Sequence, residues 1–309
     1  MNTVITPIGR EERPLTPQDA DAFEQAMTER GLTPSGRDWL CEGEACDIPT
    51  TAADKDSLAL SRWASEAAAT LGLDALAQPA EGRRKKALFA DMESTIIREE
   101  MLENLAEYVG LREKVAEITR RAMNGEIASF RDALAERLAL LKGLPVTVID
   151  EMARRMTLSD GARELVATMR AHGSHCVLVT GGFGVFTRKI ADDLGFHEEH
   201  SNILDIQDGK LTGNVVEPVK DKDSKLDVLR SVSAARGLTP EQTCAVGDGA
   251  NDLPMILEAG LGVAWRAKPN VQARAHHVIR FAGLRSLLWA QGYRREEVKA
   301  GKENPAALP

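Results

Sequence analysis

The sequence has little that would mark a secreted protein or a metal-cluster protein. It contains only four cysteines in 309 residues. Cys41 and Cys46 have no second pair and no histidine nearby, so their spacing does not indicate a zinc site. Cys176 and Cys244 lie within apolar runs and are expected to be buried as small hydrophobic residues. We therefore expect a reduced, cytoplasmic protein.

Long apolar runs and excess positive charge are missing as well. No stretch approaches the ~20 apolar residues needed to cross a bilayer, and the first residues lack the basic segment and apolar core of a secretory signal. The formal net charge is -8, which disfavours binding to nucleic acid or to an anionic membrane, because both are polyanions. A small phosphate ester is not excluded, since a few local positive groups suffice to bind it. The sequence leaves open whether the protein forms a homodimer.

Two further patterns carry little functional information. The histidine pairs His172/His175 and His276/His277 have no carboxylate or cysteine at the spacing of metal ligands, so we interpret them as surface or strand-end residues. The basic run 83–86 is interpreted as a solvated stretch before a strand rather than as a nucleic-acid patch.

Composition and periodicity divide the chain into regions. Residues 1–80 contain two predicted helices and no residue types at a catalytic spacing. The segment 78–86, QPAEGRRKK, breaks helix and strand periodicity and is interpreted as a linker. Residues 86–292 form the main region, and the polar segment 293–309 is expected to be a flexible tail.

Strands and helices alternate within the main region. Strands are predicted at 87–90, 176–179, 243–246, 261–264 and 277–279, helices at 161–172, 185–194, 224–236 and 253–259, a long helical stretch at 98–155, and a hairpin at 203–216 that turns at Asp208-Gly209. This alternation predicts an α/β fold, a Rossmann-like parallel sheet with helices on both faces. In such sheets ligands bind beyond the carboxyl ends of the strands.

The first chemically loaded segment, Asp91-Met92-Glu93-Ser94-Thr95, directly follows the strand ALFA. Two carboxylates in this position can both face one crevice, where one attacks as a nucleophile and the other transfers a proton. A second segment, Thr180-Gly181-Gly182, follows the strand CVLV. Its hydroxyl and its backbone N–H groups suit phosphate oxygens.

The third and fourth segments supply charge. Lys225 begins a predicted helix, and a lysine can neutralise both a carboxylate and a phosphate. The turn Gly247-Asp248-Gly249-Ala250-Asn251-Asp252 follows the strand TCAV. Two carboxylates in a glycine-rich turn favour magnesium, which takes a few carboxylate oxygens together with water and substrate phosphate.

Together the four segments resemble the motifs of the haloacid dehalogenase-like superfamily, which are an aspartate pair, a Ser or Thr, a lysine and an acidic glycine-rich loop. Asp91, Thr180, Lys225 and Asp248 match them in order and context. The resemblance covers about residues 86–292 and implies a Mg2+-dependent phosphatase that forms a phospho-aspartyl intermediate on Asp91.

Within the superfamily, DMESTII, AMNGEIASF, LLKGL, VTGGF and GDGANDLPM are similar to the phosphoserine phosphatase family. That resemblance implies hydrolysis of O-phospho-L-serine, the last step of serine biosynthesis, and a helical cap at about 103–157 inserted after the first strand of the core. Met123, Phe130 and Arg137 would close over the substrate. Glu100 would pair with its ammonium group and Arg137 with its carboxylate. From the pattern alone, Glu100 and Arg137 are better interpreted as solvated helix residues, and the resemblance reverses that interpretation.

The resemblance also implies a role for each remaining site residue. Mg2+ would be held by Asp91, Asp248 and the backbone carbonyl of Glu93, with support from Asp252; the phosphoryl group would contact Lys225, Thr180, Gly181 and Asn251. Glu93 would be the general acid and base. The family usually has aspartate at this position, and glutamate adds one methylene to the side chain, so the rate is in question.

Alternative functions stay open at this point. The chain can act on another small phosphate ester, or transfer phosphate to an acceptor other than water. It can also be a catalytically weakened regulator that binds a phosphorylated ligand. Residues 1–80 lie where some members of the family carry a small α/β regulatory module, and they can be a degenerate version of it, a dimerisation element or neither.

Overall fold

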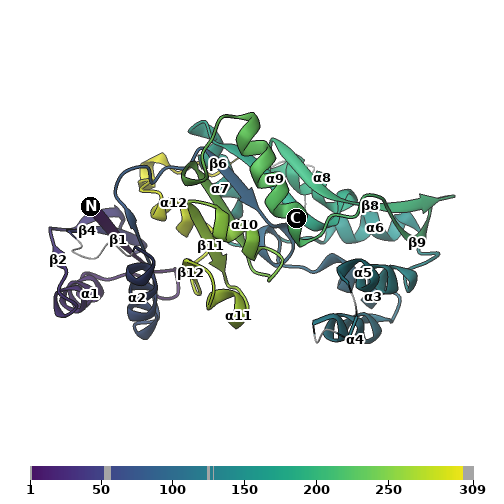
Figure 1. Cartoon of the computed structure of the whole chain (residues 1–309), viewed down its shortest axis with the longest axis horizontal. Helices are drawn as coiled ribbons and strands as arrows, with labels where there is room; N and C mark the ends of the chain where they lie inside the picture. The colour runs from purple at the N-terminus through teal and green to yellow at the C-terminus, as the bar shows by residue number, and fades with distance from the viewer. Residues whose placement is uncertain (1, 52–56, 124–125, 128, 302–309) are drawn as a thin grey trace.

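The computed structural model describes residues 2–51, 57–123, 126–127 and 129–301. Two sheets build the molecule, a five-stranded antiparallel sheet near the N-terminus and a seven-stranded sheet that is mostly parallel (Figure 1). The described helices include none that is both long and apolar enough to cross a membrane.

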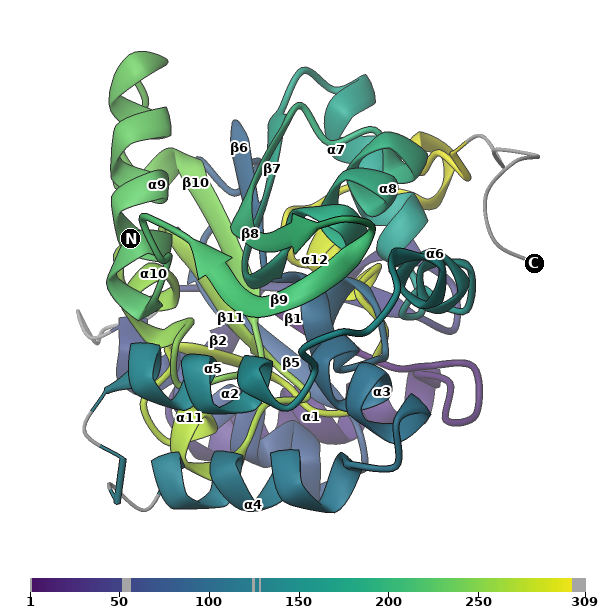
Figure 2. The ribbon, with the colours of Figure 1, turned by 90° about the vertical axis from the view of Figure 1, so that its right-hand side faces the viewer.

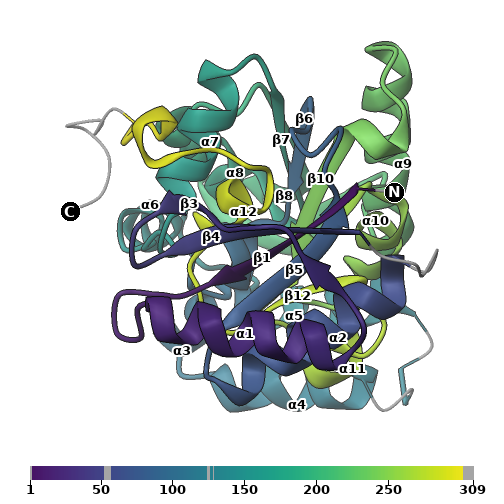
Figure 3. The same cartoon turned by 90° about the vertical axis from the view of Figure 1, so that its left-hand side faces the viewer.

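The N-terminal module has a βαβββαβ arrangement. Its strands are β1 (Asn2–Ile8), β2 (Thr33–Pro34), β3 (Asp38–Cys41), β4 (Ala45–Thr51) and β5 (Asp74–Pro79), and its helices are α1 (Pro17–Glu29) and α2 (Ser57–Thr70). Both helices pack on one face of the sheet (Figure 3), where Ile5, Phe23 and Ala64 belong to one buried cluster. The opposite face packs against α12 (Ser286–Ala290), because Ile8 and Leu76 belong to the same cluster as Trp289.

The sequence predicted the helices of this module but not its strands. Helix α1 begins at a capping box between Thr16 and Asp19, with Pro17 in the first turn, and such signals are readable locally. Strand β5 reads DALAQP, whose alanines and proline have low strand propensity. It forms a strand because it pairs with β1, more than sixty residues earlier.

The main sheet has the order β12-β11-β10-β6-β7-β8-β9. Its strands are β6 (Ala87–Ala90), β7 (His175–Phe183), β8 (Glu198–Gln207), β9 (Lys210–Val216), β10 (Thr243–Gly247), β11 (Leu261–Trp265) and β12 (His277–Ile279). All neighbouring pairs are parallel except β8 and β9, which form the predicted hairpin around Asp208-Gly209. The predicted α/β fold with a parallel sheet is therefore confirmed.

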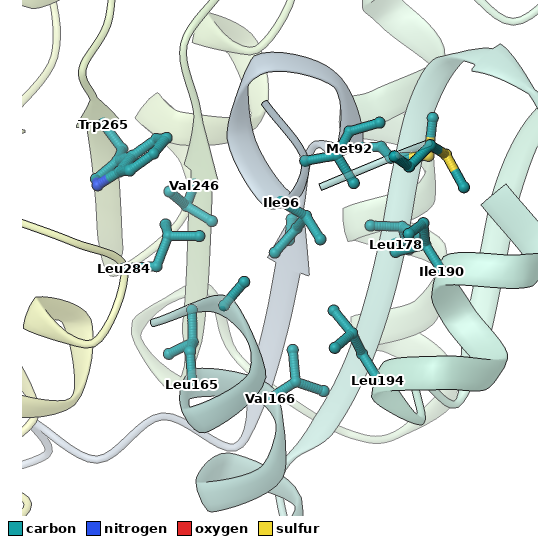
Figure 4. Close-up of a cluster of buried hydrophobic side chains, with 14 of the residues drawn as sticks. Met92, Ile96, Leu165, Val166, Leu178, Ile190, Leu194, Val246, Trp265 and Leu284 are labelled. Atoms are coloured by element: carbon teal, nitrogen blue, oxygen red, sulfur yellow. The ribbon is translucent and has the colours of Figure 1, made fainter. Parts of the chain in front are cut away.

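Helices cover both faces of this sheet (Figure 2). Helices α7 (Ala162–Ala171) and α8 (Gly184–Leu194) lie on one face, and α9 (Lys222–Ala235) and α10 (Leu253–Glu258) lie on the other. Alternate residues of each strand enter opposite cores, as Leu88 and Phe89 of β6 do. Figure 4 shows the first core, with Leu165 and Val166 of α7 packed near Leu178, Ile190 and Val246.

The insertion after β6 is a set of helices. It contains α3 (Met101–Tyr108), α4 (Arg112–Met123), α5 (Phe130–Ala139) and α6 (Val146–Arg154). We expected one long helical stretch, but Gly110 and Gly143 adopt positive φ angles of 70° and 86° that end helical turns. The two connections to the core pair with each other through a β-bridge between Ile97 and Leu158.

The predicted solvated linker at 78–86 is wrong in part. Residues 78 and 79 belong to β5. The Arg83 side chain is only 10 % exposed and forms an ion pair with Asp47, and Lys85 is buried and donates to two backbone carbonyls. A charged side chain can be buried when it has such partners, and two of them, Asp47 and the carbonyl of Glu241, come from distant parts of the chain.

The predicted flexible tail at 293–309 is anchored over its first part. Tyr293 is 1 % exposed, and Arg294 forms an ion pair with Asp38 of the N-terminal module. Residues 302–309 lie outside the described part of the chain.

His277 is a strand-end residue, as predicted, but it does not lie on the surface. It begins β12 and is buried, with Nδ1 2.8 Å from Oγ of Ser61 in α2. Burial, followed by the positive charges of His276 and Lys85, lowers the pKa of His277 from 6.5 to about 3. This histidine therefore joins the main sheet to helix α2 of the N-terminal module as a neutral ring.

The low pKa of His277 predicts a loss of stability in acid. The unfolded chain takes up a proton at this ring below pH 6.5, whereas the folded protein does so only near pH 3, so the stabilisation is complete above pH 6.5 and is lost as the pH falls. Between pH 7 and pH 5, the wild type should lose about 2 kcal/mol more unfolding free energy than His277→Gln. Denaturant titrations at both pH values measure this. The exposed-site variant His172→Gln should behave like the wild type, and an equal pH dependence for His277→Gln would contradict the prediction.

Candidate active site

The segments that carry the predicted catalytic residues meet at the carboxyl ends of three adjacent strands. Asp91 follows β6, Thr180 lies near the end of β7, and Asp248 follows β10. Because β6 lies between β10 and β7 in the sheet, these residues lie next to one another at the same edge of the sheet. Lys225 reaches the same place from the first turns of α9.

Lys225 is the centre of the charge arrangement. Its Nζ lies 2.6 Å from Oδ1 of Asp91 and 2.6 Å from Oδ1 of Asp252. All three residues are buried. Burial alone would lower the pKa of Lys225, but the charges of Asp252 and Asp91 outweigh it and raise that pKa. The lysine is therefore a permanent cation between two carboxylates.

The loop after β10 is shaped by a close approach of Asp252. Its Oδ1 accepts from Lys225 and its Oδ2 accepts from the N–H of Gly249, at 2.9 Å. A β-carbon on Gly247 would lie 2.4 Å from Cγ of Asp252, which excludes any larger residue there. Both oxygens of Asp252 thus hold the loop and the lysine in place. Asn251, in the same loop, is exposed.

The acidic cluster suits a divalent cation. Carboxylate oxygens of Asp91, Asp248 and Asp252 lie within 4.8 Å of one another. Burial, followed by the charge of Asp252, raises the pKa of Asp91 well above its usual range, and the same two causes raise the pKa of Asp248 to about 7. Three carboxylates against one lysine leave two negative charges, which a hard cation with oxygen ligands would balance.

The last residues of β7 lie across the site from the acidic loop. Thr180 is buried, and its Oγ1 accepts from the N–H of Gly182 at 2.9 Å. Asn202 of β8 donates from Nδ2 to the carbonyl of Gly181 at 2.8 Å and also bonds the backbone of Lys220. Asn202 could not be predicted, because a single asparagine within a strand has no motif around it.

Glu93 connects this site to the helical insertion. Its Oε1 accepts from the N–H of Met101, the first residue of α3, at 3.0 Å. Its Oε2 packs on Gly182, where an added β-carbon would lie 3.0 Å away. Burial, followed by the charge of Glu100, raises the pKa of Glu93 to about 7. A carboxyl group with this pKa suits general acid and base catalysis near neutral pH.

The charges of two predicted substrate-binding residues, Glu100 and Arg137, act on Glu93. Burial lowers the pKa of Arg137 in α5, and the charges of Glu93 and Glu100 oppose that shift. The Phe130 ring lies next to Gly181. Its Cζ atom is 3.5 Å from the position that a β-carbon on Gly181 would occupy. Met123 ends α4, and its side chain lies outside the described part of the chain.

Ser94 also contributes to the site, in a role that was not predicted from the sequence. It has a left-handed backbone conformation with φ 54°, and its Oγ donates to Oε1 of Glu100 at 2.7 Å. Ser94 therefore holds the Glu100 carboxylate, which is otherwise exposed. The only signal for it is its place inside the segment 91–95.

The model of the haloacid dehalogenase-like hydrolase family matches residues 88–257. The chain belongs to this family. The hydrolase is 36 % identical over 301 residues to the phosphoserine phosphatase of Streptomyces coelicolor, covering 96 % of this chain and 72 % of that protein.

Solved structures agree with the family assignment. A haloacid dehalogenase-family hydrolase from Salmonella enterica matches with TM-score 0.82 at 30 % identity, covering 93 % of this chain and 98 % of that one. A probable phosphoserine phosphatase from Vibrio cholerae matches with TM-score 0.75 at 31 % identity, covering 94 % and 87 %. Coverage of this extent includes most of the N-terminal module.

The contact between Glu93 and Gly182 predicts a specific steric effect. In Gly182→Ala the new methyl group would displace the Glu93 carboxylate, and kcat should fall about 10- to 100-fold because the proton-transfer group is misplaced. Steady-state phosphate release measures this. Gly181→Ala is the matched control, since its β-carbon meets only ordinary van der Waals contact. Shortening the side chain in Gly182→Ala/Glu93→Asp should restore much of the loss, and failure to restore it would contradict the steric explanation.

Proposed function

We propose that this hydrolase is a phosphoserine phosphatase, which cleaves O-phospho-L-serine to L-serine and phosphate. The observation that carries the proposal is the pairing of opposite charges beside the catalytic carboxylates. The charges of Glu100 and Arg137 both act on Glu93, and one acid with one arginine complements the ammonium and carboxylate of a zwitterionic amino acid. A relative that is named phosphoserine phosphatase supports the same substrate.

The reaction begins with Asp91. Its carboxylate oxygen forms a bond to phosphorus while the bond from phosphorus to the serine oxygen breaks. Lys225 already contacts Asp91, and with Thr180 and the N–H of Gly181 it stabilises the phosphoryl oxygens. Asn251 contacts the phosphate from the loop after β10.

Mg2+ would be held by Asp91, Asp248 and the carbonyl of Glu93, and when bound it neutralises the phosphate charge that repels a carboxylate nucleophile. Asp252 contributes indirectly, since both of its oxygens hold Lys225 and the loop. The excess negative charge of the cluster supports a divalent ion.

Glu93 acts first as the general acid and then as the general base. It donates a proton to the departing serine oxygen, and it then takes one from the water that attacks the phospho-aspartate, which regenerates Asp91 and releases phosphate. Its hydrogen bond to the N–H of Met101 places it at the start of the cap. The cap, at about 103–157, is an insertion in the core region 86–292. It excludes bulk water from the active site during the first step.

The proposed role of the cap residues is recognition. Arg137 holds the serine carboxylate by two parallel hydrogen bonds, and Glu100, oriented by Ser94, holds the ammonium group. Phe130 and Met123 close over the substrate. The cysteines in the described part of the chain are free and buried, which suits a reducing cytoplasm.

A substrate comparison tests the proposal. Phosphate release should be fastest with L-phosphoserine, slower with phosphothreonine and sugar phosphates, and abolished by chelation of Mg2+ and restored by its return. Asp91→Asn should lower kcat on the order of 1,000-fold while phosphoserine still binds. Turnover near the wild-type rate in that variant would remove the nucleophile assignment, and a preference for a sugar phosphate would remove the substrate assignment.

Arg137 predicts a substrate-dependent effect. Arg137→Ala should lower kcat/KM for phosphoserine about 100-fold, because a charge-assisted bidentate contact is lost, and should leave hydrolysis of p-nitrophenyl phosphate nearly unchanged. Arg131→Ala on the same helix is the matched control, since Arg131 is exposed and pairs with Glu217. Equal damage to both substrates would mean that Arg137 does not read the carboxylate.

A further inference from the structure

A buried carboxylate joins the N-terminal module to the main sheet. Asp74, the first residue of β5, is 0 % exposed. Its Oδ1 accepts from the N–H of Arg280 at 2.7 Å, and its Oδ2 accepts from the N–H groups of Phe281 and Ala282 at 3.0 and 2.8 Å. Three consecutive backbone donors on one carboxylate fix the path of this short segment, which directly follows β12.

The same segment is held from its other side by the end of β11. Nε1 of Trp265 donates to the carbonyl of Ala282 at 3.0 Å. The backbone N–H of Arg266 donates to the carbonyl of Ile279 at 2.7 Å, and the Arg266 guanidinium donates to the carbonyl of Phe281 at 2.9 Å. Residues 279–282 thus lie between Asp74 on one side and residues 265–266 on the other.

Arg266 is in a conformation that its surroundings must enforce. Its φ is +45°, in the left-handed region that non-glycine residues seldom occupy. Such a residue persists when neighbouring contacts determine its backbone. Its two hydrogen bonds to residues 279 and 281 are those contacts, so the turn after β11 depends on the segment that Asp74 holds.

That turn leads directly to a proposed metal ligand. Two residues after Arg266, the N–H of Lys268 donates to the carbonyl of Asp248 at 3.3 Å. The strands before the two loops are also paired, with Gly247 opposite Ala264. Hydrogen bonds, together with the short backbone segment 266–268, therefore connect the N-terminal module to the backbone of the metal loop. Figure 3 shows β5 and β12, which contact each other where this connection begins.

We propose that Asp74 is a positioning residue for the metal loop. It acts through residues 280–282 and the turn at Arg266 to fix the backbone of Asp248, so the N-terminal module completes the active site from a distance. The inference rests on the proposed function in one respect, that Asp248 binds the metal. A residue that merely docks the module would affect stability and leave metal affinity unchanged.

Metal binding separates the two roles. In Asp74→Asn, the amide cannot accept all three N–H bonds as a carboxylate does, and the dissociation constant for Mg2+, measured by calorimetry without substrate, should rise about tenfold. The Mg2+ concentration for half-maximal phosphate release should rise by the same factor, and kcat at saturating Mg2+ should approach that of the wild type.

Asp47→Asn is the matched control. Asp47 is also a buried carboxylate of the module that faces the rest of the chain, but it binds Arg83 and Thr6. Both variants should lower the melting temperature, and only Asp74→Asn should weaken Mg2+ binding. Wild-type Mg2+ affinity in Asp74→Asn, or equal weakening in both variants, would overturn the proposal.

A second variant covers the case in which Asp74→Asn fails to fold. Arg266 is exposed, and Arg266→Ala removes the bond to Phe281 without touching the module. It should raise the Mg2+ dissociation constant about threefold; an unchanged constant would overturn the proposal. If the wild type binds Mg2+ normally but does not prefer phosphoserine, the proposed substrate fails and this inference stands. If the wild type binds no Mg2+, both fail.

Discussion

A buried lysine held between two buried aspartates is the interaction on which the rest of the site depends. Charges are stable in a protein interior only when they are paired and hydrogen-bonded, and Lys225 satisfies this through Asp91 and Asp252. The three residues come from α9 and from the ends of β6 and β10. Their pairing therefore requires that the strands be adjacent and that the helix cross at one place. With Asp248 added, the cluster has the carboxylate oxygens that a divalent cation requires.

Glu93 contacts both the main sheet and the helical insertion. Its carboxylate lies at the first N–H of α3 and against Gly182, so it touches the core and the insertion together. The additional methylene, compared with the aspartate that is usual in the family, is accommodated because residue 182 is a glycine. The insertion has further support from the β8–β9 hairpin, where Pro145 forms a β-bridge with Lys210.

The N-terminal module is built into the molecule rather than attached to it. One face of its sheet shares a hydrophobic cluster with the main core. Buried polar contacts, such as Arg83 with Asp47 and Asp74 with residues 280–282, cross the same boundary. Such contacts need accurate geometry, because an unpaired buried charge would be costly. This explains why the polar segment 78–86, which looks like a linker, is largely fixed.

The sequence by itself determined the parts that depend on local chemistry. It placed β6 and β12, the turn at Asp208-Gly209 and the α/β alternation, and it put Asp91, Thr180 and Asp248 at strand ends that a parallel sheet brings together. Strand propensity, turn residues and glycine-rich loops act over a few positions, so they can be read in order along the chain.

Tertiary structure alone decided the pairings between distant residues. Strand β5 exists through β1, His277 is buried against Ser61, and Asn202 supports the Gly181 carbonyl from a neighbouring strand. None of these residues carries a local motif, because the partner that gives each one its role lies tens to hundreds of residues away. Only the packed fold brings these partners within hydrogen-bonding distance.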